Sequence, residues 1–424
     1  MRRLPEQEAS SRLEKLQQII ASMGADACVV TSPVNQYYLQ GFLFDGYCYI
    51  RPEGDPILFI KRPSNITGDR VWPIRKPEQI PTLLLEAGLT PPQRVLIEAD
   101  QLTYSSATRL QAALGMPETG NISGELRKIR MIKSAYELEQ MRESARVHAK
   151  VYELIPSLYR AGMTDVELQI EIERQMRLHG SVGIFRAFGE NMDIFMGSML
   201  AGDNAQAPSP FDYALGGAGI SPLLPLGANG TLLTPGTTLM VDMAGNYRPY
   251  MDDMTRSFAI EHAPDLAYKA HQVSIDIHKA IVENFTMGTT CASLYNMAEE
   301  MAKENELAPY FMGTVQQAKF IGHGVGLEIN EPPVLSPRSK ETLEPGMAFA
   351  LEPKFVLPGI GAVGIENTYI VHDDRLENIP LRRSPPLSLN KHPFTLLTSH
   401  VIICLDYFLE SSFRVYLFLK LIGV

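Results

Sequence analysis

The sequence has little of what marks several common classes of protein. It contains four cysteines in 424 residues, scattered and without a CxxC pair, which excludes a disulfide scaffold and makes a reducing cytoplasm the expected compartment. No apolar segment of the kind found in secretory signals follows the basic N-terminal residues. The net charge is −10 and no basic run of note is present, which argues against nucleic acid as a partner.

The chain does have enough apolar content for more than one core. Hydrophobic residues make up 45% of the sequence, and its length is typical of two domains. An apolar stripe predicts a helix over 10–23, and short apolar strands separated by Pro, Gly and Asp turns follow as far as residue 125. We therefore expect an α/β domain over residues 1–125, in a chain of mixed, α+β character.

The stretch 239–258 carries the first unusual residues. It predicts two short strands joined by a bend, with Asp242 in the first strand and Asp253 in the second. A carboxylate inside an apolar strand is costly unless a partner compensates for its burial. Two interpretations are open at this point: Asp242 caps a turn while Asp253 pairs with Arg256, or both aspartates bind a cation.

Two later stretches favour the cation. The segment 320–326, FIGHGVG, places His323 among three glycines, where the backbone can approach a ligand closely. The segment 350–371 predicts a second hairpin, with Glu352 on one arm and Glu366 on the other. Both glutamates lie in apolar strands, as the two aspartates do.

These five residues, in their order and local context, resemble a known metal signature. Asp242 and Asp253 stand 11 positions apart, Glu352 and Glu366 stand 14 apart, and His323 lies between the two pairs. The pattern resembles that of the pita-bread enzymes, the family that includes methionine aminopeptidase, aminopeptidase P, prolidase and creatinase. The resemblance implies a pita-bread catalytic domain in which all five residues are metal ligands.

The chemistry of this ligand set agrees with the resemblance. Four carboxylates and one imidazole suit Mn²⁺, Fe²⁺, Co²⁺ or Zn²⁺, and four negative charges favour two ions over one. Two ions about 3.5 to 4 Å apart lower the pKa of a shared water and stabilise the oxyanion of an attacked carbonyl. The resemblance implies that Asp242 binds one ion, that His323 and Glu352 hold the other, and that Asp253 and Glu366 bridge them. It also implies Glu352 as the general base.

The substrate side departs from the pattern of the proline-specific members. These usually have a histidine upstream of the first aspartate and another just after the metal histidine; the first is absent here, and Asn330 stands in the second position. Asparagine can donate a hydrogen bond to an oxyanion but cannot shuttle a proton near neutral pH, so Asn330 is a catalytic candidate with altered proton handling. Gly364 and Asn367 replace the usual Arg and Asp around Glu366, which removes a positive charge that could orient a substrate carboxylate.

The resemblance also divides the chain. The segment ADACVVTSPVNQYYLQGF resembles the N-terminal domain of the creatinase and prolidase branch, so a creatinase-like domain is expected over 1–125 and a pita-bread catalytic domain over 126–384. The Gly- and Pro-rich stretch 198–230 is interpreted as a loop over the metals on the substrate side, the alternative being an ordinary surface connection. Residues 385–424 form an atypical apolar tail, whose charged residues argue against a membrane span.

Together these features predict a cytoplasmic dinuclear-metal hydrolase that resembles Xaa-Pro peptidases. It would cleave the N-terminal bond of small peptides with a metal-activated water, using two divalent ions among which manganese is a candidate. The resemblance further implies a homodimer. Two alternatives stay open: a family member with another small-molecule reaction, such as creatinase-like C–N hydrolysis or lyase chemistry, and a pita-bread binding module without catalysis.

Overall fold

The N-terminal part of the chain folds around one mixed sheet. The computed structural model describes residues 4–189 and 195–379. The sheet has the strand order β4-β3-β2-β1-β5-β6. Its strands are β1 Ala27–Val30, β2 Asp45–Ile50, β3 Ile57–Arg62, β4 Val71–Pro73, β5 Arg94–Ile97 and β6 Glu118–Asn121, and its helices are α1 Glu6–Ser22, α2 Pro33–Gln40, η1 Pro77–Gln79, α3 Ile80–Glu86 and α4 Tyr104–Ala113. The predicted first helix and the α/β character of this part are confirmed.

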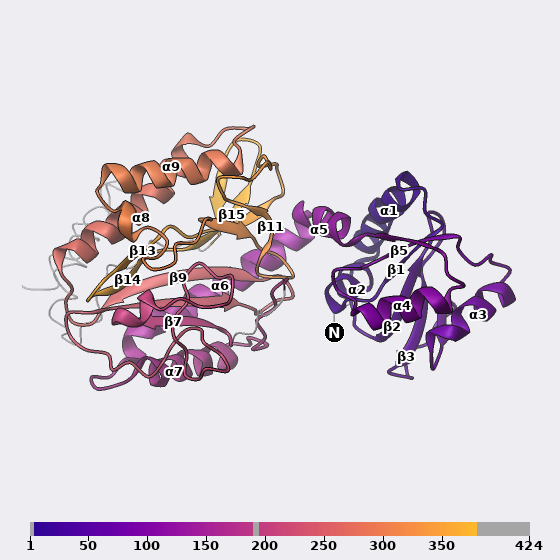
Figure 1. The fold of residues 1–424 in the computed structure, drawn as a ribbon, viewed down its shortest axis with the longest axis horizontal. Coiled ribbons are helices and arrows are strands. Elements are labelled where there is room, and N and C mark those ends of the chain that lie inside the picture. The colour runs from indigo at the N-terminus through magenta and orange to yellow at the C-terminus, as the bar shows by residue number, and fades with distance from the viewer. Residues whose placement is uncertain (1–3, 190–194, 380–424) are drawn as a thin grey trace, which may run out of the picture.

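Two helices lead from this sheet to the rest of the chain (Figure 1). Helix α5 (Ser123–Met131) is followed by α6 (Ala135–Leu158), which begins with a capping box between Ser134 and Glu137. Arg12 of α1 forms an ion pair of 3.2 Å with Glu137. The first helix of the chain is therefore tied to the first long helix of the C-terminal part.

The C-terminal part has strands in the middle and helices on both sides (Figure 1). Its sheets have the orders β7-β8-β9, β11-β10-β12-β15-β16 and β13-β14. The strands are β7 Gly197–Ala201, β8 Thr238–Gly245, β9 Asp252–Ala259, β10 Gly322–Gly324, β11 Glu331–Val334, β12 Ala348–Leu351, β13 Lys354–Leu357, β14 Gly361–Gly364, β15 Asn367–Val371 and β16 Leu376–Asn378. The helices are α7 Asp165–Leu178, η2 Gly202–Gln206, α8 Asp265–Asn284, α9 Cys291–Glu304 and η3 Ala308–Tyr310. Helices α6 and α7 contact the β7-β8-β9 sheet, whereas α8 contacts β13 and β14.

The first predicted hairpin is confirmed as β8 and β9. In its antiparallel register Asp242 lies opposite Thr255, and Ala244 lies opposite Asp253. Directly opposed residues share one face of a sheet, and so do residues two apart on one strand. Asp242, Asp253 and Thr255 therefore project from the same face.

The second predicted hairpin is present but is interrupted. Lys354 lies opposite Gly364 in the β13-β14 pair, and Ala350 lies opposite Thr368 in the β12-β15 pair. Glu352 and Glu366 fall between these two pairs, outside the described strands, so the expectation that both lie within strands is wrong. Glu366 instead forms a bridge with Thr255 of β9. The break brings both glutamates against the first hairpin.

The stretch 198–230 is only partly a loop. The sequence predicts a loop over the stretch 198–230, but β7 and η2 occupy its beginning, because strand β7 pairs with β8 over residues 197–201. The tail at 385–424 lies outside the described residues. Among the helices that the structure does describe, none is both long enough and apolar enough to cross a membrane.

Candidate metal centre

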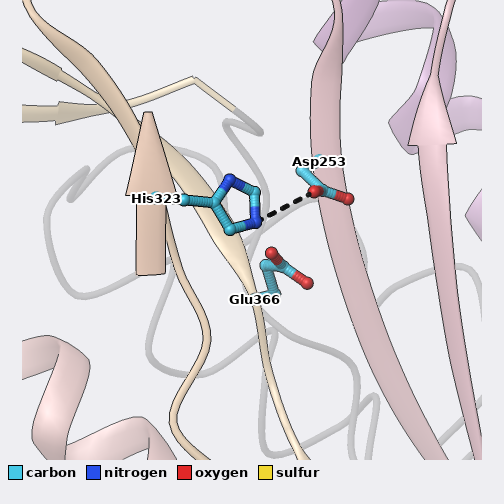
Figure 2. A group of neighbouring side chains, drawn as sticks. All are labelled: Asp253, His323 and Glu366. Atoms are coloured by element: carbon cyan, nitrogen blue, oxygen red, sulfur yellow. Dashed lines mark ion pairs between the residues drawn. The ribbon is translucent and has the colours of Figure 1, made fainter. Parts of the chain in front are cut away.

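The five predicted ligands converge from three strands, β8, β9 and β10, and from two junctions between strands. The candidate ligand atoms of Asp253, His323 and Glu366 lie within 4.8 Å of one another, and so do those of Asp242, Glu352 and Glu366. Figure 2 shows the first of these groups, with the Glu366 carboxylate beside the His323 ring. His323 Nε2 is 3.7 Å from Asp253 Oδ2 and 3.5 Å from Glu352 Oε1. Two adjoining groups of three thus share Glu366.

His323 is positioned by the glycines on either side of it. Strand β10 pairs with β11 on one side and with β12 on the other. A Cβ atom at Gly322 would lie 2.1 Å from the Ala350 carbonyl oxygen, and one at Gly324 would lie 2.1 Å from the Pro332 carbonyl oxygen. Larger residues would push the neighbouring strands apart, so the glycines hold the histidine close to the carboxylates.

Burial and mutual repulsion raise the pKa of two of the carboxylates. The pKa of Asp253 is well above its ordinary value because the group is buried and because Glu366, Asp242 and Glu352 lie nearby. Burial likewise raises the pKa of Glu366 well above its ordinary value, although Lys354 opposes the shift. The two raised pKa values indicate that the negative charge of the centre is not fully compensated by the groups around it.

A lysine that the sequence reasoning did not single out lies inside the centre. Lys354 Nζ donates to Glu352 Oε2 at 2.6 Å, to Asp242 Oδ2 at 2.8 Å and to Glu366 Oε2 at 3.1 Å. Its side chain is fully buried. Burial opposes the ammonium form, but the three carboxylates outweigh burial and raise the pKa of Lys354 well above its ordinary value. The cation among these three carboxylates is therefore part of the chain itself.

Neutral side chains and one arginine hold the carboxylates from outside. Thr255 Oγ1 donates to Glu366 Oε2 at 2.6 Å, and Thr368 Oγ1 accepts from the backbone N–H of Asp253 at 3.0 Å. Arg256 donates to the Glu366 carbonyl oxygen and to Asn367 Oδ1, each at 2.8 Å. Arg256 therefore supports the backbone around Glu366, and the described residues show no ion pair between it and Asp253.

The centre lies on the wall of a cavity of about 330 Å³. All five predicted ligands line it, and its outer wall is formed by Arg127, Phe185, Phe188, Asp212, Tyr213 and Asn330. Asp212 and Tyr213 belong to the stretch 198–230, so part of that stretch lies beside the centre as expected. The Arg127 guanidinium stacks on the Phe188 ring at 3.8 Å from its centroid.

Asn330 faces the cavity, but its amide is already hydrogen-bonded. Asn330 Nδ2 donates to the Phe188 carbonyl oxygen at 2.6 Å, and Oδ1 accepts from the Phe188 backbone N–H at 2.6 Å. These two hydrogen bonds pair the Asn330 side chain with the Phe188 backbone, as a neighbouring strand would. Asn330 therefore holds the segment around Phe188 in place. The catalytic role of Asn330 stays a prediction.

The residues fit a divalent cation on the side of Asp253, His323 and Glu366. Glu366 Oε1 is buried and has no hydrogen-bond partner among the described residues. A buried carboxylate oxygen without a donor is costly, and a cation would remove this cost. Two carboxylates and an imidazole are suitable donors for Mn²⁺, Fe²⁺, Co²⁺ or Zn²⁺.

Sequence reasoning missed Lys354 and Thr255, although the signal for both was present. Lys354 stands two positions after Glu352 in the strand that the sequence predicts, and residues two apart on a strand share one face. A lysine on the same strand face as a ligand must find an anionic partner when it is buried. Thr255 stands two positions after Asp253 by the same periodicity.

The layered fold, with carboxylates and a histidine on a cavity wall, defines the pita-bread class of metallohydrolases. The family model of the Creatinase/Prolidase N-terminal domain matches residues 12–132, and that of Metallopeptidase family M24 matches residues 139–373. The second match covers more than half of the chain. The chain therefore belongs to metallopeptidase family M24, and the predicted fold class and enzyme class are confirmed.

Relatives and solved structures agree with this placement. The chain is 25% identical over 370 residues to the Xaa-Pro dipeptidase of Pyrococcus furiosus, covering 86% of this chain and 95% of the relative. It is also 25% identical over 371 residues to the uncharacterized peptidase YqhT of Bacillus subtilis, covering 86% and 96%. The solved Xaa-Pro dipeptidase of Bacillus anthracis has the same fold, with a TM-score of 0.75 at 24% identity, covering 90% of this chain and 99% of that one.

Proposed function

We propose that this protein is a metal-dependent hydrolase that cleaves the N-terminal bond of small Xaa-Pro peptides. The observation that carries the proposal is the convergence of Asp242, Asp253, His323, Glu352 and Glu366 on the wall of one cavity. Xaa-Pro dipeptidases among the relatives and structural neighbours support the substrate class. The peptide would lie in the cavity with its scissile carbonyl toward this wall.

The residues of the chain suggest how the reaction is organised. A divalent cation held by Asp253, His323 and Glu366 would supply a Lewis acid that activates water and polarises the carbonyl. Glu352 is held by Lys354 through Oε2, while its Oε1 faces His323 at 3.5 Å. This orientation leaves Oε1 to take the proton of the attacking water and to pass it to the leaving amine.

The outer wall of the cavity suits a small, partly apolar peptide. The Phe185 and Phe188 rings offer apolar surface for a proline ring. Arg127 brings a guanidinium to the same wall. We assign it the binding of the substrate carboxylate, in place of the arginine that Gly364 replaces.

We also propose that the protein is cytoplasmic and forms a homodimer. The described cysteines, Cys28, Cys48 and Cys291, are buried and free, which supports a cytoplasmic protein. The homodimer rests on the family resemblance, and sedimentation of the purified protein measures it directly.

The activity test uses Xaa-Pro dipeptides and tripeptides with the protein loaded with Mn²⁺, Co²⁺, Fe²⁺ or Zn²⁺. The wild type should hydrolyse at least one of them, and Glu352→Gln should lower kcat by about 10²- to 10⁴-fold because it removes the general base at nearly constant volume. Proline release under saturating substrate is the measurement. Glu299→Gln, on the exposed face of α9, is the control and should keep wild-type turnover.

The outcomes separate the candidate functions. Hydrolysis that survives in Glu352→Gln would contradict the assigned base. Bound metal without hydrolysis of any peptide would reject the peptidase and favour another small-molecule reaction of the family. The absence of bound metal, together with the absence of hydrolysis, would favour the binding module.

A further inference from the structure

The centre contains a cation position that the chain fills by itself. Lys354 Nζ lies within 3.1 Å of one oxygen from each of Asp242, Glu352 and Glu366. These three residues form one of the two groups with the spacing of a metal site. Metal–carboxylate bonds are about 2.0 to 2.2 Å long, so an ion among the same three oxygens would occupy the place of the ammonium.

The backbone opposite Lys354 leaves room for its side chain. Gly364 is the register partner of Lys354 in the β13-β14 hairpin, and its φ is +147°. A Cβ atom at Gly364 would lie 3.3 Å from Lys354 Cγ and 2.7 Å from the Pro353 carbonyl oxygen. The glycine that replaces the expected arginine is therefore part of the same arrangement as the lysine.

The other group remains available for a metal ion. Glu352 uses Oε2 for Lys354 and directs Oε1 toward His323. Glu366 uses Oε2 for Lys354 and Thr255, whereas its Oε1 is buried without a partner among the described residues. Glu366 thus keeps one oxygen for a metal ion beside Asp253 and His323, and Glu352 keeps one oxygen directed toward the same side of the centre.

We infer that Lys354 replaces one of the two divalent ions, so that the chain binds a single metal ion held by Asp253, His323 and Glu366, with Glu352 beside it as the base. The inference deepens the proposed function and rests on its metal centre. The sequence predicts two ions from the charge of four carboxylates. Lys354 supplies one of the positive charges, so a single ion is expected instead. Asp242 then serves to hold the ammonium.

The test is the metal content of the full chain. Metal is removed with a chelator, Mn²⁺ is restored at saturating concentration, and bound manganese per chain is measured by mass spectrometry after gel filtration. The wild type should bind one Mn²⁺ per chain, and its electron paramagnetic resonance spectrum should be that of an isolated ion. Two bound ions with an exchange-coupled spectrum would overturn the inference, as would the absence of any bound ion.

Variants test whether the lysine is the cause. Lys354→Met removes the charge at similar length and should raise the stoichiometry from one to two, whereas Lys354→Arg should keep it at one. Lys133→Met is the matched control, because Lys133 is also fully buried against a glutamate, Glu331, but lies outside the centre; its stoichiometry should stay at one. A folded Lys354→Met that still binds one ion would overturn the inference. If that variant does not fold, the stoichiometry and spectrum of the wild type decide.

The failure of this inference is distinguishable from that of the proposed function. Metal stoichiometry is measured without any peptide. One bound ion in a protein that hydrolyses no peptide would reject the peptidase and keep the single-metal centre. Two bound ions in an active Xaa-Pro peptidase would do the reverse.

Discussion

At the scale of single residues, the centre depends on side chains that touch the carboxylates from behind. Thr255 Oγ1 donates to Glu366 Oε2 at 2.6 Å from a fully buried position. This hydrogen bond fixes the orientation of a carboxylate whose other oxygen has no partner among the described residues. Groups that hold metal ligands in this way typically change metal affinity by about 10- to 100-fold when they are removed.

We therefore expect Thr255→Val to weaken Mn²⁺ binding by about 10-fold or more without changing the number of ions bound. Valine has the shape of threonine but cannot donate to Glu366. Calorimetric titration of the metal-free protein measures the affinity. Thr108→Val, on an exposed face of α4, is the control. Equal affinities for both variants would show that Glu366 is oriented without the hydroxyl.

At the scale of elements, a pair of charged side chains attaches the last described strand to α6, the longest of the described helices. Arg142 of α6 donates to both carboxylate oxygens of Glu377 in β16, at 2.8 Å each, and His372 Nε2 lies 2.7 Å from the same carboxylate. The hydrogen bonds from Arg142 are the main cause that lowers the pKa of Glu377 from 4.5 to about 2. Protonation of Glu377 in acid therefore weakens the contact between α6 and β16.

The sign of the pH effect follows from this lowered pKa. Because the folded-state pKa lies below the ordinary value of 4.5, the pair contributes stability above about pH 4.5 and loses it as the pH falls toward about 2. We expect Glu377→Gln to reduce the loss of unfolding free energy between pH 6 and pH 3 by about 1 kcal/mol, since the pair is partly exposed and solvent screens it. Urea unfolding at the two pH values measures this. The exposed Glu304→Gln should behave as the wild type, and an identical loss in both variants would contradict the prediction.

At the scale of the whole molecule, a buried charged cluster joins the two parts of the chain. Arg130 of α5 donates to Asn35 Oδ1 of α2 at 2.7 Å, forms an ion pair of 3.0 Å with Glu331, and also pairs with Glu328. Lys133 pairs with Glu331 at 3.1 Å. The Arg130 side chain is 3% exposed, so its carboxylate partners have little access to water.

Arg130→Ala should therefore destabilise the protein by about 3 to 5 kcal/mol, because it leaves buried carboxylates without their main partner. The exposed Arg146, which pairs with Glu143 one turn away, offers the comparison: Arg146→Ala should cost less than about 0.5 kcal/mol. Urea unfolding followed by circular dichroism gives both values. Similar small losses in the two variants would show that the cluster contributes little to holding the parts together.

The sequence could predict the five candidate ligands because their types, order and local context resemble a known metal signature. Residues such as Asp253 in an apolar strand and His323 between glycines favoured a cation, and the resemblance joined them into one set. The sequence also placed the two hairpins, because strand alternation and turn residues are local signals. It could not predict the break at Glu352, since that break depends on the bridge between Glu366 and Thr255 of a distant strand.

The sequence by itself determined the family, the two hairpins and the five candidate ligands, since these follow from residue types, their order and local periodicity. Only the tertiary structure decided that Lys354 lies among three of the carboxylates and that the Asn330 amide is occupied by Phe188. Such partners are separated by 112 and 142 positions in the chain, and the burial that makes each contact necessary exists only after the strands have packed.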